Sequence, residues 1–114
     1  MEKISKKNAE HYRWGNNCDG WRLLNLPVTG IIQESMPPAT SEKEHHHKIA
    51  EQFFFIPEGQ ASIEADGKIY SLKKYEGIEI KPGINHCFFN SSDKTVEFIV
   101  ASVPSALNDR YDVT

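Results

Sequence analysis

The sequence has few cysteines and no long run of hydrophobic residues. Only two of its 114 residues are cysteine, Cys18 and Cys87, which is too few for a small fold stabilised by disulfides. We expect both to be free thiols in a reducing cytoplasm. No stretch approaches the roughly 20 apolar residues of a membrane-spanning helix. The N-terminal segment 1–8 is rich in lysine but lacks the apolar stretch of a signal peptide. The sequence therefore predicts a cytoplasmic protein outside the membrane.

An excess of positive charge is also missing. Lysine and arginine total 13 against 16 aspartate and glutamate residues, a net charge of −3. Proteins that bind nucleic acid usually carry a basic face, so we expect no nucleic-acid partner. The 39% hydrophobic and 25% charged residues are typical of one soluble globular domain. We predict a single domain over 1–114, with an N-terminal arm at about 1–25, a core at about 26–104 and a polar tail at about 105–114.

Helical periodicity is scarce after the first twenty residues. Short runs rich in β-branched and aromatic residues recur instead, separated by turn residues, which is typical of an all-β sandwich or barrel. The strongest turn signal is Asp66-Gly67, which predicts a hairpin. The segment 43–48 carries three histidines. With it, the expected strand segments are 28–36, 43–48, 53–56, 61–65, 68–72, 78–80, 85–89 and 95–103.

The run from Phe53 to Ile56 is apolar on both faces. Adjacent residues of a strand point to opposite faces, so Phe53 and Phe55 share one face while Phe54 and Ile56 share the other. Both faces therefore need a cover, either another sheet of this chain or a second subunit. The sequence leaves a buried central strand and a homodimer equally open.

Three histidines are the first candidates for chemistry. His45 and His47 are two residues apart, which on a strand places both side chains on one face with Cα atoms roughly 6–7 Å apart. Two imidazoles so placed can bind one divalent ion, while His46 should point away. His86 begins a separate apolar run, where a metal or a hydrogen-bond partner would satisfy its polar ring.

The spacing around these histidines resembles that of the cupins. The first cupin motif has Gly, five residues, His-x-His, three or four residues, Glu, six residues and Gly. Here His45-x-His47 is followed by four residues and Gln52, then by six residues and Gly59. The second motif has Gly, five residues, Pro-x-Gly, two residues, His, three residues and Asn. It is similar to the segment 83–90, which holds Gly83, His86 and Asn90.

Four positions depart from these motifs. Ala39, Tyr75 and Lys81 stand where the cupins have Gly, Gly and Pro, which shape turns. Gln52 stands at the glutamate position, with Glu51 one residue earlier. Alternation along the strand allows only one of Gln52 and Glu51 to face inward together with Phe54, and it favours Gln52. Glu51 would be the ligand only if a bulge shifted the strand.

The resemblance implies a fold, a cofactor and a function. It implies a jelly-roll β-barrel of two antiparallel sheets around one divalent transition metal ion (Fe, Mn, Ni, Zn or Cu). The ligands would be His45, His47, Gln52 and His86. The expected function is that of a metal-dependent enzyme, of dioxygenase or of isomerase or epimerase type, acting on a small polar or anionic metabolite. The alternative is a non-catalytic cupin that binds or senses a small ligand.

Several other residues are weaker candidates. Glu34 and Glu42 precede the histidines and could serve as a general base or as hydrogen-bond partners of the ligands. Arg110, which follows Asp109 in the tail, is expected to form a surface salt bridge; the alternative is that it pairs with a substrate carboxylate. An N-terminal aromatic cluster is expected to pack, or to cap the mouth of the barrel; it comprises Tyr12, Trp14 and Trp21.

Overall fold

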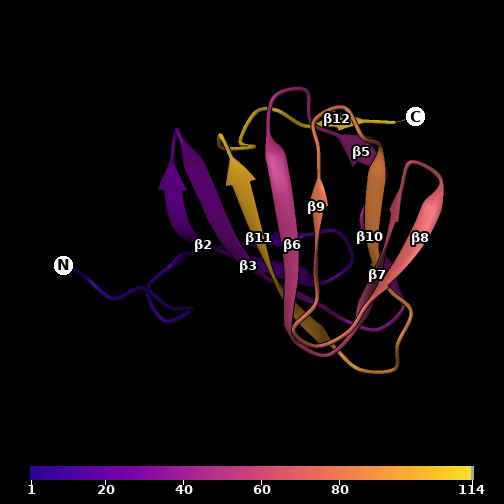
Figure 1. Cartoon of the computed structure of the whole chain (residues 1–114). Helices are drawn as coiled ribbons and strands as arrows, with labels where there is room; N and C mark the ends of the chain where they lie inside the picture. Colours follow the sequence, from indigo (N-terminus) through magenta and orange to yellow (C-terminus); the bar gives the residue numbers. More distant parts are fainter. Residues whose placement is uncertain (114) are drawn as a thin grey trace.

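The computed structural model describes residues 1–113, and two antiparallel sheets face each other in it (Figure 1). The strands of the first sheet are, in order, β1 (Glu10–Trp14), β2 (Cys18–Leu26), β3 (Thr29–Met36), β11 (Val96–Val103), β6 (Glu51–Glu58) and β9 (Gly77–Ile80). Those of the second sheet are β12 (Tyr111–Asp112), β5 (His45–His46), β10 (His86–Asn90), β7 (Ala61–Ala65) and β8 (Lys68–Leu72), with β4 (Thr40–Ser41) also paired to β10. The predicted all-β architecture is confirmed. No helix among the described residues is long and apolar enough to cross a membrane.

Aromatic rings from both sheets form the centre of the core. Phe54 of β6, Phe98 of β11 and Phe88 of β10 are all buried. The ring centroids of Phe88 and Phe98 are 4.0 Å apart, and those of Phe54 and Phe88 are 5.5 Å apart. Because β10 belongs to the second sheet and the other two strands to the first, this stack holds the two sheets together.

The turns follow the sequence closely. Asp66 and Gly67 have φ angles of 53° and 80° and connect β7 to β8, as the hairpin prediction required. Ala39 and Tyr75 also have positive φ angles, of 61° and 68°. These are the two glycine positions of the cupin motifs at which this chain carries another residue. The backbone therefore keeps a left-handed conformation that favours glycine, although side chains are present.

Strand β6 alternates as predicted. Gln52 and Phe54 point into the barrel and are 8% and 3% exposed, whereas Phe53 points outward and is 46% exposed. The outer face of β6 is therefore not covered by another sheet among the described residues, so the alternative of a fully buried central strand is wrong. The homodimer, which would cover Phe53, stays a prediction.

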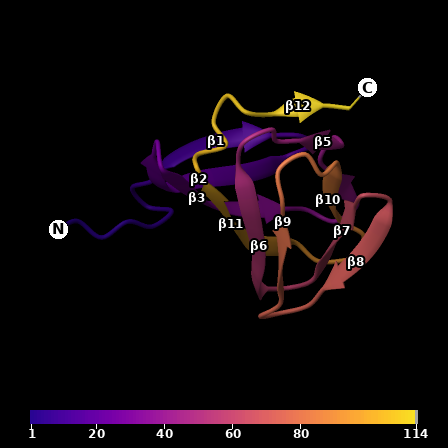
Figure 2. The same ribbon diagram turned by 45° about the horizontal axis from the view of Figure 1, so that its top comes forward.

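Both ends of the chain contribute to the barrel. Strand β1 and all but the last residue of β2 lie in the segment 1–25 that was expected to be an arm, and both strands extend the first sheet beyond β3. The C-terminal segment leaves β11, crosses one end of the barrel and pairs with β5 through β12 (Figure 2). The residue Thr114 of the predicted tail lies outside the described residues. The barrel thus includes parts of both segments that the sequence analysis placed outside the core.

Candidate metal centre and adjoining cavity

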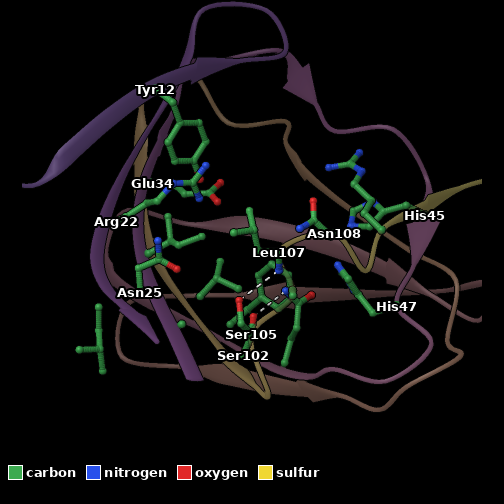
Figure 3. A pocket seen from close by; sticks show the side chains of 18 of the residues that line it. Tyr12, Arg22, Asn25, Glu34, His45, His47, Ser102, Ser105, Leu107 and Asn108 are labelled. Carbon is green, nitrogen blue, oxygen red and sulfur yellow. Dashed lines mark hydrogen bonds between the residues drawn. The ribbon is translucent and has the colours of Figure 1, made fainter. Parts of the chain in front are cut away.

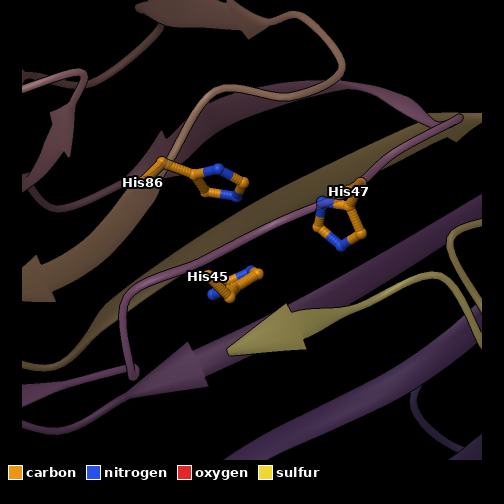
Figure 4. A group of neighbouring side chains, drawn as sticks. All are labelled: His45, His47 and His86. Carbon is orange, nitrogen blue, oxygen red and sulfur yellow. The ribbon is translucent and has the colours of Figure 1, made fainter. Parts of the chain in front are cut away.

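Three buried histidines converge inside one end of the barrel (Figure 4). His45 on β5 pairs directly with His86 on β10, and His47 follows two residues after His45. Each histidine offers one ring nitrogen such that the three atoms lie within 4.8 Å of one another. The three rings can therefore hold one ion, as expected from the sequence.

Backbone carbonyl groups fix the orientation of two of these rings. Nδ1 of His45 donates to the carbonyl oxygen of Lys43 at 2.7 Å, and Nδ1 of His86 donates to that of Ile84 at 2.9 Å. This tautomer leaves Nε2 of both rings with a free lone pair. Nε2 of His86 is buried and has no hydrogen-bond partner among the described residues. A metal ligand in a protein is commonly oriented in this way, by a hydrogen bond from its other ring nitrogen.

The histidines are held in their neutral form. Burial lowers the pKa of His45 to about 3 and that of His47 to about 4, and it also lowers the pKa of His86. A metal requires an unprotonated imidazole, so the site is ready to bind an ion at neutral pH. The unpartnered Nε2 of His86 and the three neutral nitrogens together fit a divalent transition metal.

Gln52 lies at the same end of the barrel and lines the cavity together with His45 and His47. Its Nε2 donates to the hydroxyl of Ser102 at 3.0 Å, while its Oε1 is buried without a partner among the described residues. Glu51 is exposed, and the irregularity in the pairing of β6 lies elsewhere, opposite Glu97 to Ile99. The parity argument for Gln52 over Glu51 is consistent with this burial. Ligation by Gln52 stays a prediction.

A cavity of about 310 Å³ adjoins the histidines. It lies between the two sheets and is closed in part by the C-terminal segment, whose residues Ser105 and Leu107 line it (Figure 3). His45 and His47 lie on one side of this space, and Tyr12 and Glu34 lie on the other. The cavity therefore has a histidine end and an acid–base end.

The acid–base end is built across three neighbouring strands. Tyr12 on β1 pairs with Gly20 on β2, and Gly20 pairs with Glu34 on β3. A Cβ atom at Gly20 would lie 2.3 Å from Cζ of Tyr12, so the missing side chain leaves the space that the ring occupies. Tyr12 and Glu34 both line the cavity, and the guanidinium of Arg22 lies 4.3 Å above the tyrosine ring. Of the N-terminal aromatic residues, Tyr12 lines the cavity. Trp21 lies beside His11, with ring centroids 5.2 Å apart.

Two carboxyl groups of the cavity have raised pKa values. Burial and the nearby Glu42 raise the pKa of Glu34 from 4.5 to about 8, although the neighbouring Tyr12 opposes the shift. Burial raises the pKa of Glu42 to about 7, although its Oε1 accepts the backbone N–H of Phe88 at 2.9 Å. Groups that titrate close to neutral pH can both accept and donate a proton in a reaction.

The tail contributes a clamp that was not predicted. Asp109 is 7% exposed, and its carboxylate accepts the backbone N–H groups of Lys48, Ile49 and Ala50 at 2.9 to 3.0 Å. These residues follow His47 directly. Arg110 forms the expected surface salt bridge, with Asp112 at 3.0 Å. Local sequence held no signal for the contact between Asp109 and the backbone after His47, since it joins residues about 60 positions apart.

The chain belongs to the cupin family. The family model of the cupin domain matches residues 32–102, which include all three histidines and Gln52. A curated relative, the polyketide synthase CurC of Streptomyces cyaneus, is 29% identical over 91 residues and 75% of this chain. The chain spans 59% of the length of that relative.

Solved structures agree with this fold. The polyketide cyclase RemF of Streptomyces resistomycificus superposes with a TM-score of 0.82 at 16% identity, covering 100% of this chain and 86% of its own. The nucleoside dehydratase Pac13 of Streptomyces gives 0.82 at 13% identity, over 99% and 91%. A sugar phosphate isomerase from Silicibacter pomeroyi gives 0.79 at 19% identity, over 91% and 76%. The predicted jelly-roll barrel is therefore confirmed, and these neighbours include enzymes of several kinds.

Proposed function

We propose that this cupin is a metal-dependent enzyme of isomerase type, which moves a proton at a carbon atom next to a carbonyl group of a small molecule. One observation carries the proposal: a single cavity holds the histidine centre and, facing it, the pair of Tyr12 and Glu34 (Figure 3). A proton-transfer enzyme needs a titratable group within reach of its substrate, and this cavity supplies one.

His45, His47 and His86 would hold the ion, with Gln52 as the fourth ligand. A divalent ion bound by neutral ligands keeps its charge and supplies Lewis-acid chemistry, which makes a C–H bond next to a carbonyl group more acidic. Hydrogen bonds to the backbone carbonyl groups of Lys43 and Ile84 orient the rings of His45 and His86. The side chains of all three histidines are buried.

Glu34 would transfer the proton. In its ionised form the carboxylate accepts the proton from carbon, and in its protonated form it returns a proton to the same or another carbon. With a pKa raised to about 8, both forms are present close to neutral pH. Tyr12 would hold the carboxyl group in place, and Gly20 leaves the space that the tyrosine ring occupies.

Proton transfer is favoured over dioxygenation, the other reaction type expected from the sequence. Dioxygenation requires no acid–base pair, whereas here a pair with shifted pKa values faces the metal centre. The names of the similar proteins include a cyclase, a dehydratase and an isomerase. These names support a reaction without net oxidation.

Solvent deuterium exchange tests the proposal. Protein loaded with Zn(II), Ni(II), Mn(II) or, under anaerobic conditions, Fe(II) is incubated in heavy water with a panel of hydroxyketones, keto acids and hydroxyaryl ketones. Loss of the C–H signal next to the carbonyl group is followed by proton NMR. We expect exchange with at least one compound, dependence on the metal, and a loss of roughly 10²- to 10⁴-fold in Glu34→Gln.

Glu58→Gln is the matched control, because Glu58 is an exposed residue of β6 outside the cavity. It should exchange at the rate of the unaltered protein. Binding of these compounds without any exchange would contradict the proposal and would support the non-catalytic alternative. Oxygen uptake with iron, measured on the same panel, would favour dioxygenation instead.

A further inference from the structure

The floor of the cavity carries a strip of three apolar side chains. Ile32 on β3 pairs with Val100 on β11, and Val100 pairs with Phe54 on β6. These strands are neighbours in the first sheet, and all three side chains line the cavity. Strands lie about 4.8 Å apart, so the strip is roughly 10 Å long and follows the pleated surface of the sheet. None of the three side chains offers a hydrogen bond to a ligand lying on it.

Polar groups lie along both edges of this strip. Along one edge, Ser102 of β11 pairs with Gly30 and with Gln52. Along the other, Glu34 lies two residues after Ile32 on the same face of β3. The strip is thus bounded by the Ser102 and Gln52 side chains on one edge and by the carboxyl group of Glu34 on the other.

The C-terminal segment forms an apolar cover over part of the same space. Ala106 and Leu107 line the cavity, and Leu107 is 55% exposed although it is apolar. In the close view, Leu107 lies between the histidine end and the acid–base end (Figure 3). A ligand between this cover and the strip would have apolar atoms on both of its faces. Ser105, Asn108 and Arg110 of the same segment also line the cavity, so the apolar faces of this slot are the strip on one side and Ala106 with Leu107 on the other.

We infer that the substrate is a flat ring compound, with an apolar body that lies on Ile32, Val100 and Phe54 and with oxygen functions on two opposite edges. This inference deepens the proposed function and rests on it for the role of the two cavity ends. One oxygen function meets the histidine end, and the other meets Tyr12 and Glu34. A sugar fits this slot poorly, because hydroxyl groups above the strip would lose their hydrogen bonds to water without replacement.

The charge of the cavity adds one further property. Arg22 and Arg110 both line it, while the raised pKa values of Glu34 and Glu42 leave these carboxyl groups partly protonated. The side chains that line the cavity therefore carry no net negative charge, and the cavity can accept an anionic group such as a carboxylate or an ionised enol. Arg110 belongs to the same tail as the cover and lies toward the histidines, since its charge contributes to the lowered pKa of His45.

Binding of two model compounds tests the inference. The first probe is 6-hydroxy-2-naphthoate, a flat body with oxygen at both ends, and the second is glucuronate, an anion of comparable charge with hydroxyl groups on its faces. Dissociation constants are measured by isothermal titration calorimetry on the protein loaded with Zn(II) and on metal-free protein. We expect the naphthoate to bind at least tenfold more tightly than glucuronate in both forms.

Two variants locate the binding. Val100→Thr keeps the side-chain volume but places a hydroxyl group in the strip, and it should weaken naphthoate binding about tenfold. Val103→Thr is the matched control on the same strand, because Val103 is 60% exposed and lies outside the cavity. Leu107→Ser alters the exposed cover and leaves the core intact, so it tests the slot even if Val100→Thr does not fold.

The outcomes separate this inference from the proposed function. Selective naphthoate binding that is weakened by Val100→Thr or Leu107→Ser supports the inference, even if no compound exchanges its protons. Glucuronate binding as tight as that of the naphthoate overturns it, as does the absence of naphthoate binding up to millimolar concentration. Indifference of naphthoate binding to both variants also overturns it, whatever the result of the exchange assay.

Discussion

Tyr12 and Glu34 meet at one end of the cavity although their strands are not neighbours in the sheet. Strand β2 lies between them, and its residue at the crossing point is Gly20, over which the tyrosine ring lies. The glycine at this position therefore has a direct role in placing the proposed catalytic carboxyl group.

Gly20→Ala should displace Tyr12 from Glu34. The new Cβ would lie 2.3 Å from Cζ of the ring, so the ring must move or the strands must separate. We expect a loss of about 1–3 kcal/mol in the free energy of unfolding together with slower proton exchange. Tyr12→Phe is the matched variant: it keeps the ring and should slow exchange with little loss of stability. Urea unfolding and the deuterium assay measure both effects, and an unchanged Gly20→Ala protein would contradict this account of the pair.

The stability of the metal-free protein should fall as the pH rises from about 6.5 to about 8, because the buried histidines add stability with rising pH only up to their ordinary pKa of 6.5. The pKa of Glu34 is about 8 in the folded protein, against an ordinary value of 4.5, so folding favours its protonated form. Its contribution is complete below pH 4.5 and is lost as the pH rises to about 8. Glu34→Gln removes this titration and should make the decline less steep. Urea unfolding across this range checks the slope, with Glu58→Gln as the control that should behave like the unaltered protein.

Asp109→Asn should weaken metal binding without touching a ligand. The amide can accept fewer of the three backbone N–H groups that follow His47, so the segment carrying this histidine becomes less well fixed. Changes next to metal ligands typically cost about 10- to 100-fold in affinity. Competition with a chelating dye measures the affinity, and Asp93→Asn, at an exposed position, is the control. Equal affinities of the two variants would show that the clamp does not position His47.

Ala39→Gly should stabilise the protein. Ala39 has a φ angle of 61°, and the left-handed conformation costs a residue with a Cβ roughly 1–2 kcal/mol relative to glycine. Part of this gain is lost to the greater freedom of glycine in the unfolded chain, so a net gain of about 0.5–1 kcal/mol is expected. Thermal unfolding measures it. Gly67→Ala, at a φ angle of 80°, is the reverse change and should destabilise the protein.

Much of the barrel could be predicted because its signals are local. The alternation in β6 placed Gln52 inside and Phe53 outside, and Asp66-Gly67 gave the hairpin between β7 and β8. The spacing of the histidines was equally informative, since His45 and His86 become direct neighbours across two strands.

The rest could not be predicted because it depends on contacts between distant segments. Asp109 looks like any polar residue of a tail until its carboxylate is seen against the backbone after His47. Tyr12 lay in a segment expected to be an arm, and its role depends on Gly20, which has no side chain to signal it. The raised pKa of Glu34 likewise follows from burial in the folded barrel, which no local pattern reveals.

Metal content tests the central claim most directly. The untagged protein is incubated anaerobically with Fe(II), and separately with Zn(II) or Ni(II), desalted, and analysed by elemental analysis together with His47→Ala and His46→Ala. His46 is the control, because it stacks on Tyr111, with ring centroids 5.6 Å apart, and is not one of the three converging histidines. The account predicts about one ion per chain in the unaltered protein and in His46→Ala, and loss of the ion in a folded His47→Ala. Full occupancy in His47→Ala, or no metal in any of the proteins, would contradict it.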